Sequence, residues 1–170
     1  RFGEKSYLQG VDINSQSFYD LVQKTRIVPK TSLPSPAQVI EFYKKIAQKG
    51  DEILSIHIGS KLSGTFSVIQ MAAQELKNDF KIVTVDSGAG SAALGFMCRD
   101  ARLMHQNGAP LEKIAAKLAD FHKKVVVVFT LDTLEYAYLN GRVSALQTAL
   151  SSMLRIKPII VLKDGLLSMV

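Results

Sequence analysis

The sequence predicts an α/β protein in which a mostly parallel sheet carries helices on both faces. Three observations predict this class. Short strand-like segments alternate with longer segments of helical periodicity along most of the chain. The run VVVVF at residues 125–129 is apolar on both faces, as expected of a buried parallel strand. Near the end, Lys163-Asp164-Gly165 is typical of a tight turn, which predicts one antiparallel hairpin after the parallel sheet.

The individual elements follow from helix-start signals, helix-stop signals and periodicity. Residues 15–24 predict a short helix with Phe18, Leu21 and Val22 on one side. Ser35 has the character of an N-cap, Pro36 suits the first helical position, and Gly50 ends this second helix. The remaining predicted elements are strand 52–58, helix 65–76, strand 81–85, helix 89–106, helix 110–123, strand 125–129, helix 133–139, helix 145–154, strand 156–162 and strand 166–170.

Composition and charge narrow the class of protein. The 170 residues are 47% hydrophobic and 21% charged, as in soluble globular proteins, and no apolar run approaches the ~20 residues of a membrane span. The net charge of +6 suits an anionic partner, including transient contact with a membrane surface. The basic residues are scattered and no nucleic-acid motif is present, so a nucleic-acid partner is not expected.

The single cysteine, Cys98, rules out an internal disulfide and is compatible with a reducing cytoplasm, which is the expected localisation. It lies in an apolar helical stretch. We therefore expect it to be a small buried residue and not a catalytic thiol.

Three hydroxyl-rich segments fall in predicted loops, where ligand sites of α/β proteins form. The first is KTSLPSP at residues 30–36, which by itself also fits a rigid turn with an N-cap. The second is SKLSGT at residues 60–65, between a strand and a helix. Its hydroxyls, backbone N–H groups and helix N-terminus suit a phosphate or a carboxylate, although Ser63 also fits a simple cap. The third is LEYAYLNGRVS at residues 134–144, where Arg142 suits either an anion or the carbonyls of a helix end.

The sequence lacks the motifs of nucleotide-binding, metal-binding and catalytic sites. The sequence contains no dinucleotide fingerprint, P-loop, metal-ligand spacing or nucleophile elbow. His57, His105 and His122 are far apart in the chain, and Asp86-Ser87 is expected to cap a helix. No cofactor, metal or catalytic residue is therefore predicted. Two alternatives stay open: a small-molecule enzyme that binds a phosphorylated substrate at the SxLSGT loop, and a basic nucleic-acid-binding module.

Taken together, the segments resemble the DegV family. The matching strings are KTSLPS (30–35), SKLSGTF (60–66), VDS (85–87), DTLEYAYLNGRVS (132–144), IKPII (156–160) and DG (164–165). Leu33 stands where glutamine is usual in the family, and Phe66 where tyrosine is common. Family members are longer, and they begin with a strand and a TDS-type loop that are absent here. The resemblance therefore predicts a fragment: residues 1–144 form an α/β fatty-acid-binding domain without its N-terminal edge, and residues 145–170 begin a truncated second α/β domain.

The resemblance also implies a function. Similar proteins are non-catalytic bacterial carriers that bind a long-chain fatty acid, such as palmitate or stearate, and present it to a separate fatty acid kinase subunit. In them the Thr of the first motif and the Ser of the SGT motif hold the carboxylate; a histidine supplied by their C-terminal part has no counterpart here. Six apolar side chains could line the acyl chain, although each by itself fits plain core packing better: Leu94, Phe96, Met97, Leu146, Leu150 and Met153. The predicted ligand-binding residues are Thr31, Ser32, Ser63, Gly64, Thr65 and Arg142, with Arg142 placed near the carboxylate or on the surface that faces the kinase.

Overall fold

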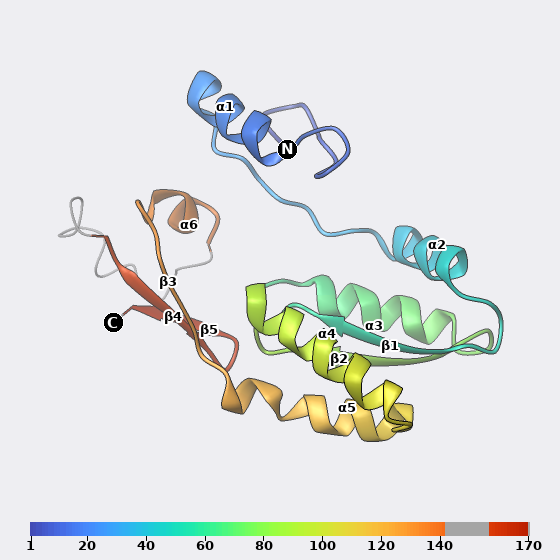
Figure 1. Ribbon diagram of the computed structural model, residues 1–170. Helices are drawn as coiled ribbons and strands as arrows, with labels where there is room; N and C mark the ends of the chain where they lie inside the picture. The colour runs from blue at the N-terminus through green and yellow to red at the C-terminus, as the bar shows by residue number, and fades with distance from the viewer. Residues whose placement is uncertain (142–156, 170) are drawn as a thin grey trace.

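A computed structural model describes residues 1–141 and 157–169. Figure 1 shows an α/β body on one side, an antiparallel sheet on the other, and an N-terminal segment that reaches α2 through an extended stretch. The elements, in chain order, are α1 (Ser15–Thr25), α2 (Pro36–Ile46), β1 (Glu52–His57), α3 (Thr65–Glu75), β2 (Lys81–Asp86), α4 (Ser91–Gln106), α5 (Leu111–Ala119), the 3-10 helix η1 (Phe121–Lys124), β3 (Val127–Thr130), α6 (Glu135–Leu139), β4 (Ile159–Lys163) and β5 (Leu166–Met169).

The body of the fold is the parallel pair β1–β2 with helices on both faces, as the sequence predicts. The strands run in register from Glu52 opposite Lys81 to His57 opposite Asp86. Because side chains alternate along a strand, Ile53 packs with α2 and α3, while Leu54 and Ile56 pack with α4 and α5. Because the two strands are parallel, their carboxyl ends lie at the same edge of the sheet, where the loops before α3 and α4 begin.

Helix α2 forms where its start signals predict. Ser35 Oγ accepts a hydrogen bond from the N–H of Gln38 at 3.2 Å, and Gln38 Oε1 accepts one from the N–H of Ser35 at 2.8 Å. This reciprocal pair satisfies two N–H groups that helical geometry leaves free. Val39, Ile40 and Tyr43 then bury one stripe of the helix.

The third sheet strand differs from the prediction. We expected residues 125–129 to form a buried parallel strand, but β3 pairs antiparallel with β4, from Val127 opposite Leu162 to Thr130 opposite Ile159. Val128 is 60% exposed, so this strand has one covered and one open face. An apolar run shows that a segment is strand-like but does not show the direction of its neighbour.

The hairpin at the end of the chain is confirmed. β4 and β5 are antiparallel, and Asp164 and Gly165 form the two-residue turn with φ angles of +52° and +74°. Two consecutive positive φ angles match the twist of the strands, which explains why the sequence places Asp-Gly here. The predicted helix at residues 145–154 and the predicted domain boundary at residue 144 lie outside the described residues.

Two smaller expectations were wrong. The helix predicted for residues 110–123 ends at Ala119 and continues as η1. Cys98 is exposed, because the buried stripe of α4 runs through Ala93, Met97 and Ala101. A residue one position after Met97 is rotated by ~100° and leaves that stripe.

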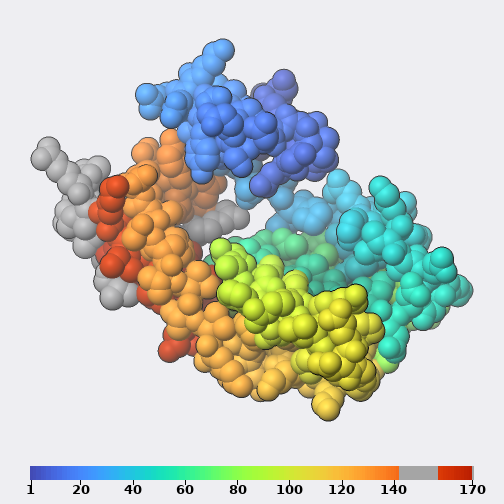
Figure 2. All heavy atoms as spheres, in the orientation of Figure 1, coloured from blue at the N-terminus to red at the C-terminus, as the bar shows by residue number. Residues whose placement is uncertain are grey.

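The N-terminal segment forms its own lobe (Figure 2). Phe2 is buried against Phe18 of α1, with ring centroids 5.4 Å apart. Arg1 and Lys30 exchange two backbone hydrogen bonds of 2.8 and 3.0 Å, which fix the start of the KTSLPS segment to this lobe. Among the described residues, no helix combines the length and hydropathy needed to span a membrane.

Candidate functional site

The candidate site lies at the carboxyl edge of the parallel pair, where two loops meet. The N–H of Gly59, after β1, donates to the carbonyl of Ala89, after β2, at 2.8 Å. Asp86 joins the loops a second time, because its Oδ1 accepts from the N–H of Ser60 at 3.1 Å and from the N–H of Gly88 at 2.9 Å. Burial by itself raises the pKa of Asp86, but these hydrogen bonds, together with one from the Ser60 side chain, outweigh it and lower the pKa.

Asp86 and Ser87 therefore do not cap α4, contrary to the expectation. Helix α4 begins after Gly90, and no side chain caps it. Ser87 is 1% exposed; its hydroxyl donates to the carbonyl of Ala89 at 3.0 Å and accepts from the N–H of Ala89 at 3.1 Å. The VDS string thus shapes the loop after β2 and supports the neighbouring SKLSGT loop.

The SKLSGT loop forms a compact turn before α3. The N–H groups of Leu62 and Ser63 both donate to the carbonyl of Gly59, at 2.9 and 3.2 Å. Ser63 Oγ lies 2.8 Å from Thr65 Oγ1 and accepts from the N–H of Thr65 at 3.3 Å. Two half-buried hydroxyls therefore stand together at the positive end of α3, an arrangement suited to an anionic ligand.

The KTSLPS segment lies against this loop. Leu33 Cδ1 is 3.0 Å from the position that a Cβ on Gly64 would occupy, so the two segments touch at Leu33 and Gly64. Thr31 and Ser32 are exposed on the same segment, and Ser35 is used as the cap of α2. The structure thus brings together the segments that carry five of the six predicted residues. Arg142, the sixth, lies outside the described residues.

A buried polar chain under this edge was missed by the sequence analysis. His57 Nε2 is 2.7 Å from Ser55 Oγ, and Ser55 Oγ is 2.5 Å from Tyr43 Oη. Burial lowers the pKa of His57, and burial also raises the pKa of Tyr43 against the opposing effect of its bond to Ser55. Both shifts favour the neutral forms. The signal was present in EILSIH, where Ser55 and His57 share one face with the apolar Ile53.

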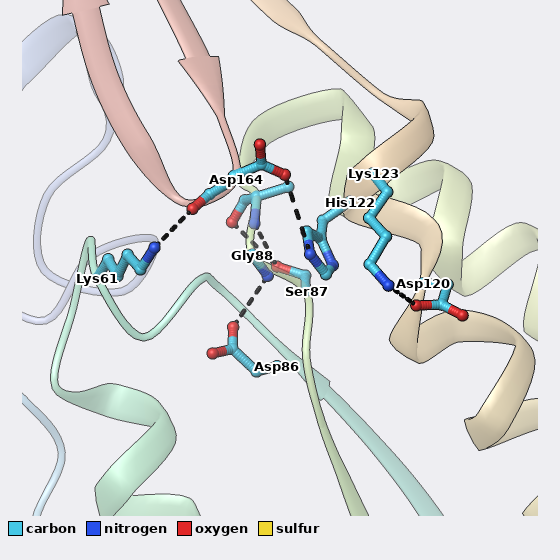
Figure 3. A network of polar contacts seen from close by, with 9 residues as sticks. Lys61, Asp86, Ser87, Gly88, Asp120, His122, Lys123 and Asp164 are labelled. Carbon is cyan, nitrogen blue, oxygen red and sulfur yellow. Dashed lines mark hydrogen bonds and ion pairs between the residues drawn. The ribbon is translucent and has the colours of Figure 1, made fainter.

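A second missed group connects the loops to the hairpin turn (Figure 3). Lys61 Nζ donates to the carbonyl of Asp164 at 3.1 Å, and His122 Nε2 lies 3.9 Å from Asp164 Oδ1. The two ends of the first contact are 103 residues apart in the chain. No local pattern indicates such a contact.

Two cavities lie away from this edge. One, of about 690 Å³, is lined by α3 and the outer edge of β2, and includes Gln74 and Thr84. The other, of about 270 Å³, lies between α4 and α5 and includes Met104 and Phe121. Neither is lined by a predicted ligand-binding residue. Of the predicted acyl-chain residues, Met97 is fully buried beside Val85 and Phe96 is 49% exposed, whereas Leu146, Leu150 and Met153 lie outside the described part.

Both the loop strings and the fold match known proteins. The family model described as an uncharacterised protein of the DegV family matches residues 1–170. The chain belongs to the DegV family. The DegV domain-containing protein of Deinococcus radiodurans is 31% identical over 164 residues, which cover 96% of this chain and 58% of that protein. Protein DegV of Bacillus subtilis is 32% identical over 160 residues, covering 94% and 57%.

Solved structures agree with this membership. The chain is similar to a DegV family protein from Thermus thermophilus described by its fatty acid binding, with a TM-score of 0.86, 30% identity, and coverage of 99% of this chain and 60% of that one. For Bacillus subtilis DegV, described as a fatty acid binding protein, the TM-score is 0.83 and the identity 30%, and the match covers 98% of this chain and 59% of that one. For a stearic acid-binding protein from Eubacterium ventriosum, the TM-score is 0.86 and the identity 25%, and the match covers 99% of this chain and 59% of that one. This DegV chain thus spans less than two thirds of the length of the relatives that it matches.

Proposed function

We propose that this DegV chain binds a long-chain fatty acid and holds its carboxylate at the edge formed by the SKLSGT and KTSLPS segments. The observation that carries the proposal is the likeness to three solved structures that are described as binding fatty acids. Each of these matches covers 98–99% of the present chain.

The chemistry of the edge supports the same ligand. A carboxylate that leaves water needs hydrogen-bond donors, and the Ser63 and Thr65 hydroxyls stand at the N-terminus of α3. Thr31 and Ser32 extend from the adjoining segment, and Gly64 lets that segment approach. Arg142 is proposed to lie near the carboxylate or on the surface that faces the partner. The space-filling view is hollowed between the N-terminal lobe and the α/β body, where an acyl chain would be sheltered (Figure 2).

The proposed role is that of a carrier without catalysis. The family resemblance supports a cytoplasmic protein that presents its fatty acid to a separate kinase subunit, which would form the acyl phosphate. The net charge of +6 supports transient contact with an anionic membrane surface, from which a fatty acid is taken up. No cofactor enters this scheme. Asp86 accepts the N–H groups of two loops through one carboxylate oxygen, and its lowered pKa makes it a poor general base for the alternative enzyme.

The test compares stearate with stearyl alcohol, which has the same tail without the carboxylate. Stearate is expected to raise the melting temperature of the wild-type protein, because a ligand that binds only the folded state stabilises it. Thr31→Ala with Ser63→Ala should weaken stearate binding by about 1.5–3 kcal/mol for each lost bond to the charged group, and change alcohol binding little.

The matched control is Ser67→Ala, an exposed serine on the same helix α3. The unliganded melting temperature of each variant is measured as well, because Ser63 also bonds Thr65. Equal stearate affinity in the double variant and the wild type would place the carboxylate elsewhere. No stabilisation of the wild type by stearate would contradict fatty-acid binding by this chain.

A further inference from the structure

The hairpin turn between β4 and β5 rests on both loops of the candidate site (Figure 3). Lys61 Nζ donates to the carbonyl of Asp164 at 3.1 Å. At the next residue, a Cβ on Gly165 would lie 3.3 Å from Lys61 Cδ and 3.6 Å from the carbonyl oxygen of Gly88. The turn therefore packs against the lysine stem after β1 and against the backbone after β2.

His122 of η1 lies next to the same turn. Its Nε2 lies 3.9 Å from Asp164 Oδ1, and its side chain is 28% exposed. A Cβ on Gly88, whose φ is +54°, would be only 3.0 Å from His122 Cβ, so the ring packs closely over the loop after β2. A side chain at position 88 would be strained by its backbone and would displace the histidine.

The charges around the turn are mixed. The carboxylates that face His122 are Asp86, Asp120 and Asp164, and the cations around them are Lys61, Lys123 and Lys124. Asp120 is engaged by Lys123 at 2.5 Å. Lys61 is different from the other lysines, because its ammonium reaches a backbone carbonyl of the turn and its loop carries Ser63.

The chain neighbours of Lys61 are held by hydrogen bonds on both sides. Lys61 lies between Ser60, held by Asp86, and Leu62, held by the carbonyl of Gly59. The next N–H, that of Ser63, donates to the same carbonyl at 3.2 Å. The ammonium of Lys61 adds a contact between the turn and this segment, whose conformation sets the position of the Ser63 hydroxyl.

We propose that the β4–β5 turn is a latch and that Lys61 is a positioning residue: it holds the 60–65 loop in the conformation that receives a carboxylate. The inference rests on the proposed fatty-acid binding for its ligand, but the latch itself is a property of the unliganded chain. Preorganised donors bind better because less ordering remains to be done when the ligand arrives.

The first test uses the unliganded chain and amide hydrogen exchange. Lys61→Met keeps the aliphatic stem against Gly165 and removes the ammonium. The amides of Leu62 and Ser63 should exchange roughly three- to tenfold faster, the range for one lost hydrogen bond. Lys61→Arg should restore slow exchange, and Lys113→Met, at an exposed lysine of α5, should not change it. Unchanged exchange in Lys61→Met would overturn the latch. If stearate binding weakened while exchange stayed unchanged, the ammonium would contact the ligand directly, and the latch would again be overturned.

The second test measures affinity for stearate and for stearyl alcohol. The latch predicts that Lys61→Met weakens stearate several-fold and leaves the alcohol unchanged, whereas a merely structural role would weaken both. Equal weakening of the two ligands would overturn the positioning role. If the wild type binds neither ligand while exchange still rises in Lys61→Met, the latch stands and the proposed function fails.

Discussion

At the residue scale, the site depends on side chains that hydrogen-bond to the loop backbone, and in one case these bonds shift the pKa of the side chain. Asp86 is the clearest case, because one carboxylate oxygen serves the N–H groups of two loops and its pKa is lowered in spite of burial. Ser63 has two partners in Thr65, the hydroxyl and the N–H. These residues hold backbone in place as well as offering polar atoms.

We expect His57 to make the stability of the fold depend on pH. Burial lowers its pKa below the ordinary value of 6.5, so between these two values the unfolded chain binds more protons than the folded one. The free energy of unfolding should therefore fall as pH drops below 6.5 and level off once the pH is below the folded pKa. His57→Gln, which still offers a hydrogen bond to Ser55, should flatten this dependence.

The measurement is denaturant unfolding between about pH 5 and 8, the range in which histidine usually titrates. His105→Gln, at an exposed histidine of α4, is the control and should keep the wild-type slope attributed to His57. A His57→Gln profile that is as steep as the wild-type profile would show that another group produces the dependence.

At the element scale, the starts of α2 and α3 determine where the two hydroxyl-rich segments of the candidate site end. Helix α3 begins at Thr65, within the candidate anion site, and α2 begins immediately after the KTSLPS segment. The cap formed by Ser35 and Gln38 fixes where the KTSLPS segment ends, whereas α3 follows Gly64 without a side-chain cap. The SKLSGT loop was predictable as a strand-to-helix junction, because both flanking elements have clear periodicity.

Loss of the α2 cap should be measurable. Ser35→Ala removes the acceptor of the Gln38 N–H and should lower the free energy of unfolding by about 1 kcal/mol. Ser32→Ala, an exposed serine in the same segment, should stay within about 0.5 kcal/mol of the wild type in the absence of ligand. Equal losses in the two variants, compared by chemical denaturation, would mean that the cap contributes nothing.

At the scale of the whole molecule, the parallel pair is sealed by two separate hydrophobic clusters. One is formed with α2 and α3 around Tyr43 and Leu76, and the other with α4 and α5 around Met97 and Leu118. A third cluster, around Leu134 and Ile160, covers one face of the antiparallel sheet. The latch at Lys61 lies where the first sheet meets the second.

A leucine in the core of the second cluster should contribute strongly to the stability of the body. Leu118 is 1% exposed, and Leu118→Ala should lower the free energy of unfolding by about 2–5 kcal/mol, because the cavity cannot close fully. Leu103 on α4 is 49% exposed, and Leu103→Ala should cost at most about 0.5 kcal/mol. Thermal and denaturant unfolding decide this, and similar losses for both leucines would contradict the assigned packing.

The sequence by itself determined what depends on near neighbours in the chain. Helical periodicity, the Ser35–Pro36 start and the Asp164–Gly165 turn each act within a few residues, so the α/β class, most elements and the hairpin followed from them. The loop strings likewise indicated the family. The roles of Thr31, Ser32, Ser63, Gly64, Thr65 and Arg142 toward a ligand stay predictions.

Only the tertiary structure decided which distant segments meet. It showed that β3 joins an antiparallel sheet, that Leu33 reaches Gly64, that His57 completes a chain to Tyr43, and that Lys61 holds the turn at Asp164. The physical reason is the same in each case. These contacts join residues that the chain separates, so their free energy depends on how whole elements pack, and a local pattern does not record that packing.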